Sequence, residues 1–211
     1  MTIRVLLADD HAMMRDGLKA LLGASQGISV VAEVSNGRDA VGQIQELKPD
    51  VAILDISMPD LNGIEATRML RDKCPETRVL ILSMHSNSEL LFRALEAGAA
   101  GYILKEAAGA ELEAAIREVH DGRRYLSRAI APIAQTSGAG RSSPLDSLSA
   151  RERQVLQLVV EGHSSAEIAK RVNLSPKSVD TYRSRLMKKL GVNDVPSLVK
   201  FAVQHGITPP L

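Results

Sequence analysis

The sequence predicts a doubly wound α/β domain followed by a small all-α domain. In residues 1–121, short apolar runs alternate with amphipathic stretches, which is typical of repeated strand–helix units. From residue 148 onward, amphipathic stretches continue but no strand pattern is present. The chain has 211 residues, a length that suits two small domains.

Five apolar runs in the front half predict five strands. They do not alternate with polar residues, as expected for strands buried on both faces, and lie at 3–8, 28–34, 51–54, 79–82 and 101–104. The helix-like stretches that follow them lie near 12–23, 37–47, 63–73, 88–97 and 109–120. Because strand–helix–strand crossovers are right-handed, these units predict a five-stranded parallel sheet of flavodoxin-like type with helices on both faces.

The back half is predicted to contain four helices, near 149–161, 165–171, 176–190 and 195–205. Ser149 and Glu152 have the spacing of a capping box at the start of the first helix. The candidate N-caps of the other helices are Ser164 or Ser165, Ser175, and Asn193 or Asp194. The short connections between these four helices predict a compact helical domain over residues 148–211.

A linker is predicted between the two domains, over residues 122–147. Gly, Ser and Pro concentrate in its second part, and the apolar periodicity ends after Ile133. A short helix can stand at the front of this linker. The predicted front domain therefore covers residues 1–121.

Composition restricts the class of protein. No run approaches the roughly 18 apolar residues that a membrane span requires. The N-terminal apolar run meets Asp9 and Asp10 too early for a signal peptide. Cys74 is the only cysteine, so no internal disulfide can form. These features predict a cytoplasmic protein that does not associate with membranes.

Charge is distributed unevenly along the chain. The whole chain has a formal net charge of +1, but residues 142–211 carry ten Lys and Arg against six Asp and Glu. The back half is therefore basic and the front half acidic. This asymmetry predicts different partners for the two halves, with a polyanion such as DNA for the second.

Polar residues follow four of the five predicted strands. Asp9 and Asp10 follow the first strand, Asp55 the third, Ser83 the fourth and Lys105 the fifth. In a doubly wound sheet, ligands bind beyond the carboxyl ends of the strands. We therefore expect three carboxylates, one hydroxyl and one ammonium group to converge in one pocket.

The chemistry of this set points to phosphoryl transfer. Clustered carboxylates resist ionisation unless a cation neutralises them, and Mg²⁺ prefers such oxygen ligands. A carboxylate can also attack phosphorus and form an aspartyl phosphate. Mg²⁺ and Lys105 would then stabilise the charge of the transferred group, and Ser83 could donate a hydrogen bond to it.

The segments LLADDH, VAILDISMPDLNGIEA, VLILSMHS and GYILKEA resemble those of a response-regulator receiver domain, over roughly residues 1–121. The resemblance implies that a sensor histidine kinase phosphorylates Asp55. It also implies that Asp9, Asp10 and Asp55 bind Mg²⁺ together with the backbone carbonyl of Ser57. Gly63 fits the loop that follows the phosphoacceptor.

The same resemblance assigns roles to residues near the last two strands. Ser83 and Lys105 contact the phosphoryl group. Tyr102 matches the switch aromatic, whose ring reorients when Ser83 is drawn towards the phosphate. His11 and His85 lie close to these residues but receive no role, and we expect them to be structural or solvated.

The helix predicted at 176–190 has two contrasting faces. Val179, Leu186 and Leu190 form one apolar stripe. The predicted DNA contacts on the other side are Lys177, Ser178, Asp180, Thr181, Ser184, Arg185 and Lys188. A helix of this kind suits the major groove, where Lys and Arg neutralise phosphates. Thr181 and Ser184 can approach base edges.

This helix lies in a stretch that resembles the helix-turn-helix output domain of LuxR/FixJ-class regulators, over about residues 145–208. The resemblance rests on Leu-Ser-x-Arg-Glu at 148–152, Glu-Ile-Ala at 167–169 and Lys-Leu-Gly-Val at 189–192. It implies that residues 176–190 are the recognition helix. Asp180 stands where many members carry a basic or neutral residue. An acid there is repelled by phosphates but can accept a hydrogen bond from a cytosine amino group.

Together these features predict a DNA-binding response regulator of the NarL/FixJ family. Phosphorylation would switch its dimerisation, so that a homodimer binds a two-fold site in double-stranded promoter DNA. No catalysis is expected beyond self-phosphorylation and self-dephosphorylation at Asp55.

Two alternatives belong to other classes. A phosphate-ester hydrolase that uses an aspartyl phosphate needs a second carboxylate two residues after the nucleophile, where this chain has Ser57. A DNA-binding protein controlled without phosphate would not need the acidic set at the strand ends.

Overall fold

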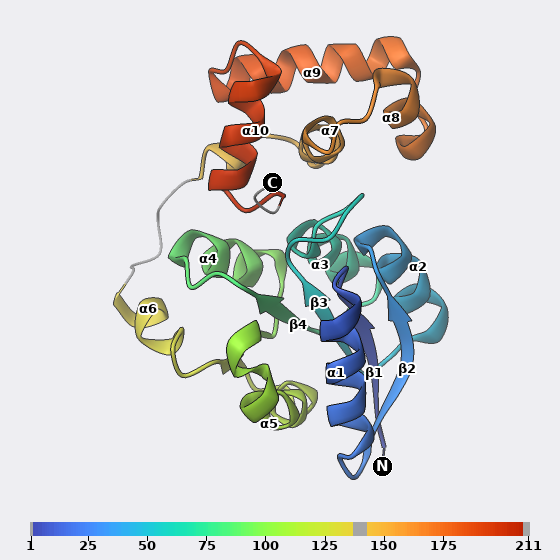
Figure 1. Ribbon diagram of the computed structural model, residues 1–211, viewed down its shortest axis with the longest axis vertical. Helices are drawn as coiled ribbons and strands as arrows, with labels where there is room; N and C mark the ends of the chain where they lie inside the picture. Colours follow the sequence, from blue (N-terminus) through green and yellow to red (C-terminus); the bar gives the residue numbers. More distant parts are fainter. Residues whose placement is uncertain (1, 137–142, 209–211) are drawn as a thin grey trace. The chain divides into compact units, whose positions relative to one another are not determined.

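The computed structural model describes residues 2–136 and 143–208. The chain divides into two compact units, Met1–Ala139 and Gly140–Leu211. The first unit is a parallel sheet with helices on both faces, and the second is built from helices (Figure 1). Within the described residues, none of the helices combines the length and apolar character that crossing a bilayer requires.

Six parallel strands form the sheet of the first unit, in the order β2-β1-β3-β4-β5-β6. Their bounds are β1 Ile3–Ala8, β2 Ile28–Val34, β3 Val51–Asp55, β4 Arg78–Ser83, β5 Gly101–Leu104 and β6 Tyr125–Leu126. The strand order reverses between β1 and β3, and in doubly wound sheets the crevice for ligands lies at such a reversal. The residues that follow β1 and β3 are therefore placed at this crevice.

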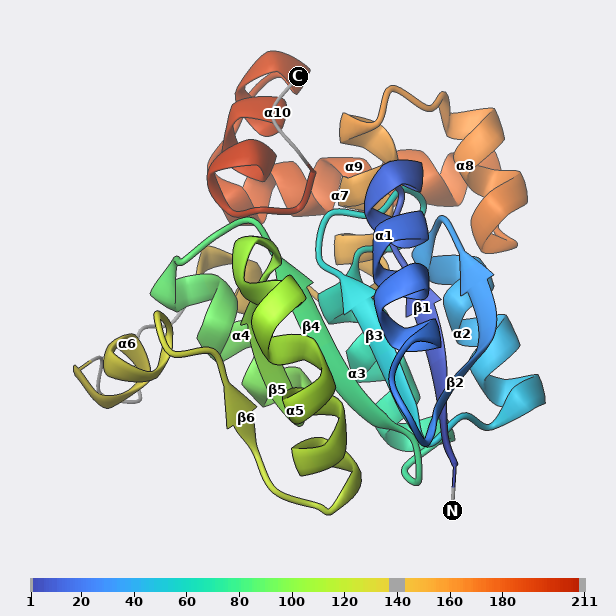
Figure 2. The ribbon, with the colours of Figure 1, turned by 60° about the horizontal axis from the view of Figure 1, so that its bottom comes forward.

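The strands lack polar alternation because both faces of the sheet are covered. In β1, Val5 and Leu7 face one apolar core, while Leu6 and Ala8 face the other. The first core is closed by α1 Ala12–Gly23 and α5 Ala108–His120 (Figure 2). The second is closed by α2 Gly37–Leu47, α3 Gly63–Lys73 and α4 Ser88–Ala97. The doubly wound fold predicted from the sequence is confirmed.

The sheet has one strand more than the five predicted. In β6, the backbone N–H of Tyr125 donates to the carbonyl of Ala100 at 3.1 Å, and that of Ser127 donates to the carbonyl of Tyr102 at 2.9 Å. A helix, α6 Ala131–Thr136, follows this strand, and Ile130 is fully buried. These elements fall within the range predicted as a linker, because a two-residue strand has no periodicity in sequence. Residues 137–142 of that range lie outside the described residues.

The second unit contains four helices around one apolar core. They are α7 Ala150–Val160, α8 Ser165–Val172, α9 Pro176–Leu190 and α10 Val195–Gln204, preceded by a 3₁₀ helix at Pro144–Ser147. Ser149 and Glu152 form the predicted capping box of α7. Ser164, rather than Ser165, caps α8, and Asp194, rather than Asn193, caps α10. These caps satisfy backbone N–H groups that would otherwise have no partner.

Candidate functional site

The residues predicted at the strand ends of the first unit meet at one edge of the sheet. Asp9 follows β1, Asp55 ends β3 and Lys105 follows β5, and they are 1 %, 2 % and 5 % exposed. The Lys105 Nζ lies 2.8 Å from Asp9 Oδ2 and 2.8 Å from Asp55 Oδ2. One buried ammonium group therefore bridges two buried carboxylates. We call the cluster of Asp9, Asp10, Asp55 and Lys105 the acidic pocket.

Burial and charge act in opposite directions on Asp55 and Lys105. Burial raises the pKa of Asp55, while the ammonium of Lys105 and the backbone N–H of Ser57 limit this rise. For Lys105, burial lowers the pKa, but attraction by Asp55 and Asp9 outweighs burial, and the pKa is raised. Lys105 therefore retains its proton and favours the ionised form of Asp55, which is the nucleophilic one.

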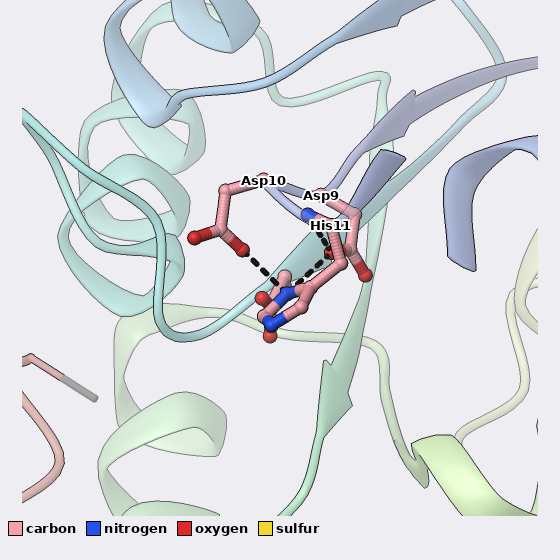
Figure 3. Close-up of side chains that lie close together, drawn as sticks. Asp9, Asp10 and His11 are labelled. Carbon is pink, nitrogen blue, oxygen red and sulfur yellow. Dashed lines mark hydrogen bonds and ion pairs between the residues drawn. The ribbon is translucent and has the colours of Figure 1, made fainter. Parts of the chain in front are cut away.

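Asp10 lies at the rim of the acidic pocket and contacts a histidine. Its side chain is 29 % exposed, and its Oδ1 lies 2.7 Å from Nδ1 of His11 (Figure 3). The same ring nitrogen lies 3.3 Å from Asp9 Oδ1, and the backbone N–H of His11 donates to that oxygen at 2.9 Å. No role for His11 was expected from the sequence. Sequence spacing carries no signal for these contacts, because they depend on the turn between β1 and α1.

The donor set of the acidic pocket fits a hard divalent cation. Ligand atoms from Asp9, Asp10, His11 and Asp55 all lie within 4.8 Å of one another. Three carboxylates face one ammonium group, so negative charge is in excess. Oxygen-rich, partly open sites of this kind suit Mg²⁺.

The loop after β3 is packed closely against the acidic pocket. Ser57 lies beside the Asp55 carboxylate, to which its backbone N–H donates. Gly63 begins α3, and a Cβ at this position would lie only 2.2 Å from the carbonyl oxygen of Asp55. Glycine is therefore required at residue 63, because any side chain would displace the backbone that carries Asp55.

Ser83 and Tyr102 are joined through the backbone of His85. The backbone N–H of His85 donates to Ser83 Oγ at 3.0 Å, and the Tyr102 hydroxyl donates to the His85 carbonyl at 2.9 Å. Tyr102 is fully buried, and burial raises the pKa of its hydroxyl to about 12. The Tyr102 ring is thus already turned inward in this structure. The role of the His85 backbone was not foreseen from the sequence.

In the second unit, α9 presents the predicted polar face to solvent. Lys177, Asp180, Thr181, Ser184, Arg185 and Lys188 are all exposed, and we call this set the recognition face. Val179 and Leu186, on the opposite side, are fully buried and anchor the helix. The arrangement matches that of a helix that can enter a groove while its other side holds the domain together.

Some polar groups of α9 are already engaged within the second unit. Ser178 is half-buried, and its hydroxyl lies 2.8 Å from that of Ser175 at the start of the helix. The Thr181 hydroxyl donates to the carbonyl of Lys177 at 2.9 Å. Lys189 lies 2.7 Å from the buried Glu152 of α7. Among the described residues of the recognition face, only Asp180 forms a hydrogen bond with α8. The Ser165 hydroxyl donates to Asp180 Oδ1 at 2.6 Å.

Two family models match the two units. Residues 5–117 match the model described as response regulator receiver domain. Residues 146–202 match the model described as bacterial regulatory proteins, luxR family. The first match alone covers more than half of the chain.

Relatives and solved structures agree with these two matches. Response regulator UvrY of Escherichia coli (strain K12) is 38 % identical over 208 residues, covering 97 % of this chain and 95 % of the relative. A LuxR-family two-component response regulator from Aurantimonas has a TM-score of 0.61 at 40 % identity, covering 64 % of this chain and 97 % of that one. The two-component response regulator RcsB, solved as a complex with DNA, has a TM-score of 0.60 at 26 % identity and covers 95 % of this chain and 98 % of its own.

Proposed function

This chain belongs to the response regulators that join a receiver domain to a LuxR-type DNA-binding domain, and from this premise we propose that phosphorylation of Asp55 switches its binding to promoter DNA. The protein is a DNA-binding regulator of transcription. The observation that carries the proposal is the contact of the Lys105 ammonium with both Asp9 and Asp55 at 2.8 Å. This contact supports the proposal because it puts a positive charge beside the buried Asp55 carboxylate, at the edge of the sheet where ligands bind in folds of this type.

The phosphoryl transfer uses Asp55 as its nucleophile. A carboxylate oxygen of Asp55 attacks the phosphorus of a phosphohistidine on a sensor kinase, forming a P–O bond as the P–N bond breaks and the imidazole leaves. Lys105 supports this step because it favours the ionised form of Asp55. Its ammonium group is also close enough to Asp55 to pair with an oxygen of the incoming phosphoryl group.

Asp9, Asp10 and Asp55 are the side chains that would hold Mg²⁺, with the backbone carbonyl of Ser57 as a further ligand. The excess of carboxylates in the acidic pocket and the short separation of their oxygens support this assignment. Bound Mg²⁺ would neutralise the charge of the phosphoryl group during transfer. The His11 ring contacts only Oδ1 of Asp10, which leaves the second carboxylate oxygen available as a ligand.

Ser83 and Tyr102 would convert phosphorylation into a change of shape. In the phosphorylated protein the Ser83 hydroxyl donates to a phosphoryl oxygen, which alters its present contact with His85. Tyr102 shares His85 as a partner, so the segment between β4 and α4 shifts with both side chains. The phosphoryl oxygens supply the difference in contacts between the two states that such a switch requires.

The output of the switch is DNA binding by a homodimer. Two copies of α9 would enter the major groove of a two-fold promoter site. Lys177, Arg185 and Lys188 would contact phosphates, while Ser178, Thr181 and Ser184 would approach base edges. The exposure of the recognition face supports this role, as does the similarity to RcsB, which was solved bound to DNA.

Catalysis is limited to self-phosphorylation and self-dephosphorylation of Asp55. A hydrolase that turns over phosphate esters through an aspartyl phosphate would need a carboxylate two residues after Asp55, and Ser57 occupies that position. Ser57 has no acidic proton to give to a leaving group at neutral pH.

The test measures binding to a promoter-fragment library with and without a small-molecule phosphodonor and Mg²⁺. Wild type is compared with Asp55→Asn and with Asp16→Asn, a matched control at an exposed acid on α1. We expect the phosphodonor to tighten DNA binding and to promote dimers for wild type and Asp16→Asn, and to leave Asp55→Asn unchanged. Equal binding by all three proteins in both conditions would leave DNA binding intact and refute the phosphorylation switch.

A further inference from the structure

Asp180 is the one acidic residue in α9, and it lies within the recognition face. Its neighbours at helical spacing are Lys177 and Ser184, three residues before it and four after it, so its carboxylate is presented on the same side as the Lys177 ammonium. An acid here weakens attraction to the phosphate backbone. A specific partner for the carboxylate would offset that cost.

The carboxylate of Asp180 is held in place by α8. The Ser165 hydroxyl donates to Asp180 Oδ1 at 2.6 Å, and this bond joins the two helices of the helix-turn-helix. Ser165 is available for this contact because Ser164, not Ser165, caps α8. The hydrogen bond restricts the rotamer of Asp180 before any DNA is bound, so the position of its second oxygen is set by the fold.

The chemistry of a carboxylate restricts what it can read in the major groove. Ionised Asp only accepts hydrogen bonds, and the only base-edge donors there are the amino groups of cytosine and adenine. The adenine amino group lies beside N7, an acceptor whose lone pair repels a carboxylate. With one oxygen engaged by Ser165, the remaining oxygen of Asp180 matches the single donor of cytosine.

We propose that Asp180 is a specificity-determining residue that reads one cytosine in the major groove, and that Ser165 is the residue that positions it. This proposal rests on the proposed function of α9 as the recognition helix. Asp180 increases discrimination because its repulsion from the phosphates weakens binding at every site, and only a cytosine offsets this cost through a hydrogen bond.

The experiment uses the full chain, treated with a small-molecule phosphodonor and Mg²⁺, and a randomised duplex DNA library whose bound fraction is sequenced. Wild type should enrich cytosine at one position of each half-site. Asp180→Asn should shift that preference towards adenine, because Asn donates to N7 and accepts from the amino group. We expect a change of roughly tenfold in the cytosine-to-adenine ratio at that position.

Variants of Ser165 test its positioning role at the same base. Ser165→Ala should weaken the cytosine preference several-fold without moving it to another base, while Ser165→Thr, which keeps the hydroxyl, should retain it. A merely structural role would alter affinity for all sequences equally. Circular dichroism establishes that each variant is folded.

A phosphate contact provides the matched control. Lys188→Gln should lower binding to every sequence and leave the base preferences unchanged. If Asp180→Asn keeps the wild-type preference at every position, the proposal is refuted while DNA binding stands. Loss of all binding by folded Asp180→Asn would refute it as well, because the proposal leaves the phosphate contacts intact in this variant and predicts a shifted base preference. Failure of wild type to bind any DNA would instead refute the proposed function.

Discussion

The two charged regions of the molecule differ in burial and in pairing. In the acidic pocket, Asp9, Asp55 and Lys105 are at most 5 % exposed and contact one another directly. On the recognition face, Lys177 and Lys188 are exposed, and within the described residues neither forms an ion pair. The first region pairs the ammonium of Lys105 internally and keeps an excess of carboxylates, whereas the second leaves the charges of its lysines exposed for a partner.

This difference explains how the two regions can serve different roles. A buried charge interacts strongly with its neighbours, so adding one phosphoryl group or cation can shift the whole local balance. An exposed charge is screened by water and salt, and each one contributes a small, nearly independent amount to binding. Burial therefore suits a switch, and exposure suits an additive contact surface.

The largest effect on stability is expected when the ammonium group of Lys105 is removed. Lys105→Met keeps the apolar stem but leaves Asp9 and Asp55 without their shared partner. Without Mg²⁺ at neutral pH, we expect the free energy of unfolding to fall by about 3 kcal/mol, together with a loss of Asp55 phosphorylation. Urea denaturation, followed by circular dichroism and with phosphodonor labelling in parallel, measures both effects.

The stability lost in Lys105→Met is expected to depend on pH. The pKa of Asp55 is already raised by burial, and a carboxylate with a raised pKa in the folded state is destabilising when ionised. The difference in free energy of unfolding between wild type and Lys105→Met should therefore be largest at neutral pH. It should shrink as the pH falls through the folded-state pKa of Asp55. Lys73→Met, at an exposed lysine, is the control and should change stability little. If Lys105→Met changed stability as little as Lys73→Met, buried and exposed charges would not differ in the way described above.

An intermediate effect is expected at Glu152, a buried acid in the second unit. Burial acts to raise its pKa, but hydrogen bonds from Lys189 and Ser149 outweigh burial, and the pKa is lowered. Glu152→Gln should reduce local stability by about 1–2 kcal/mol at neutral pH. Hydrogen exchange of the backbone amides of α7, read by mass spectrometry, measures this loss within the second unit alone.

The pH dependence at Glu152 has the opposite sign to that at Asp55. Because the folded-state pKa is below the ordinary value of 4.5, the stabilisation by Glu152 is present above that value and is lost as the pH falls through the lowered pKa. Wild type and Glu152→Gln should therefore converge in acid. A difference in exchange that persists unchanged at low pH would show that packing, not charge, is responsible.

The smallest effect is expected on the recognition face. Lys188→Gln should weaken binding to all DNA sequences several-fold and reduce the slope of log K against log salt by about 1. Fluorescence anisotropy over a series of salt concentrations measures this slope. Lys200→Gln, at an exposed lysine of α10, is the control and should leave the slope unchanged. Equal slopes for the two variants would show that Lys188 does not contact a phosphate.

Much of the fold could be predicted because long elements carry strong local signals. The strands β1 to β5 are predominantly apolar and lack polar alternation, and the helices have clear apolar stripes or caps, so each was predicted from its own residues. β6 was missed because its two residues are strand only through hydrogen bonds to β5. α6 falls in the range predicted as a linker with a possible short helix, and its packing against the core of the first unit was not indicated by the sequence.

The candidate site shows the same division. Asp9, Asp55 and Lys105 could be grouped from sequence because the carboxyl ends of parallel strands meet at one edge. The contact of His11 with Asp10 and the hydrogen bond of Ser165 to Asp180 could not be foreseen. Such contacts depend on side-chain rotamers and on how neighbouring elements pack, neither of which leaves a pattern in sequence spacing.

The order of the long strands and helices, the family resemblance and the residues that gather at the edge of the sheet could all be read from the sequence. Periodicity and strand ends are local properties, so they can be read from the chain alone. The bridge of Lys105 to Asp9 and Asp55, and the hydrogen bond of Ser165 to Asp180, are known only from the folded structure. These contacts join side chains of different elements, and their distances are set by how those elements pack.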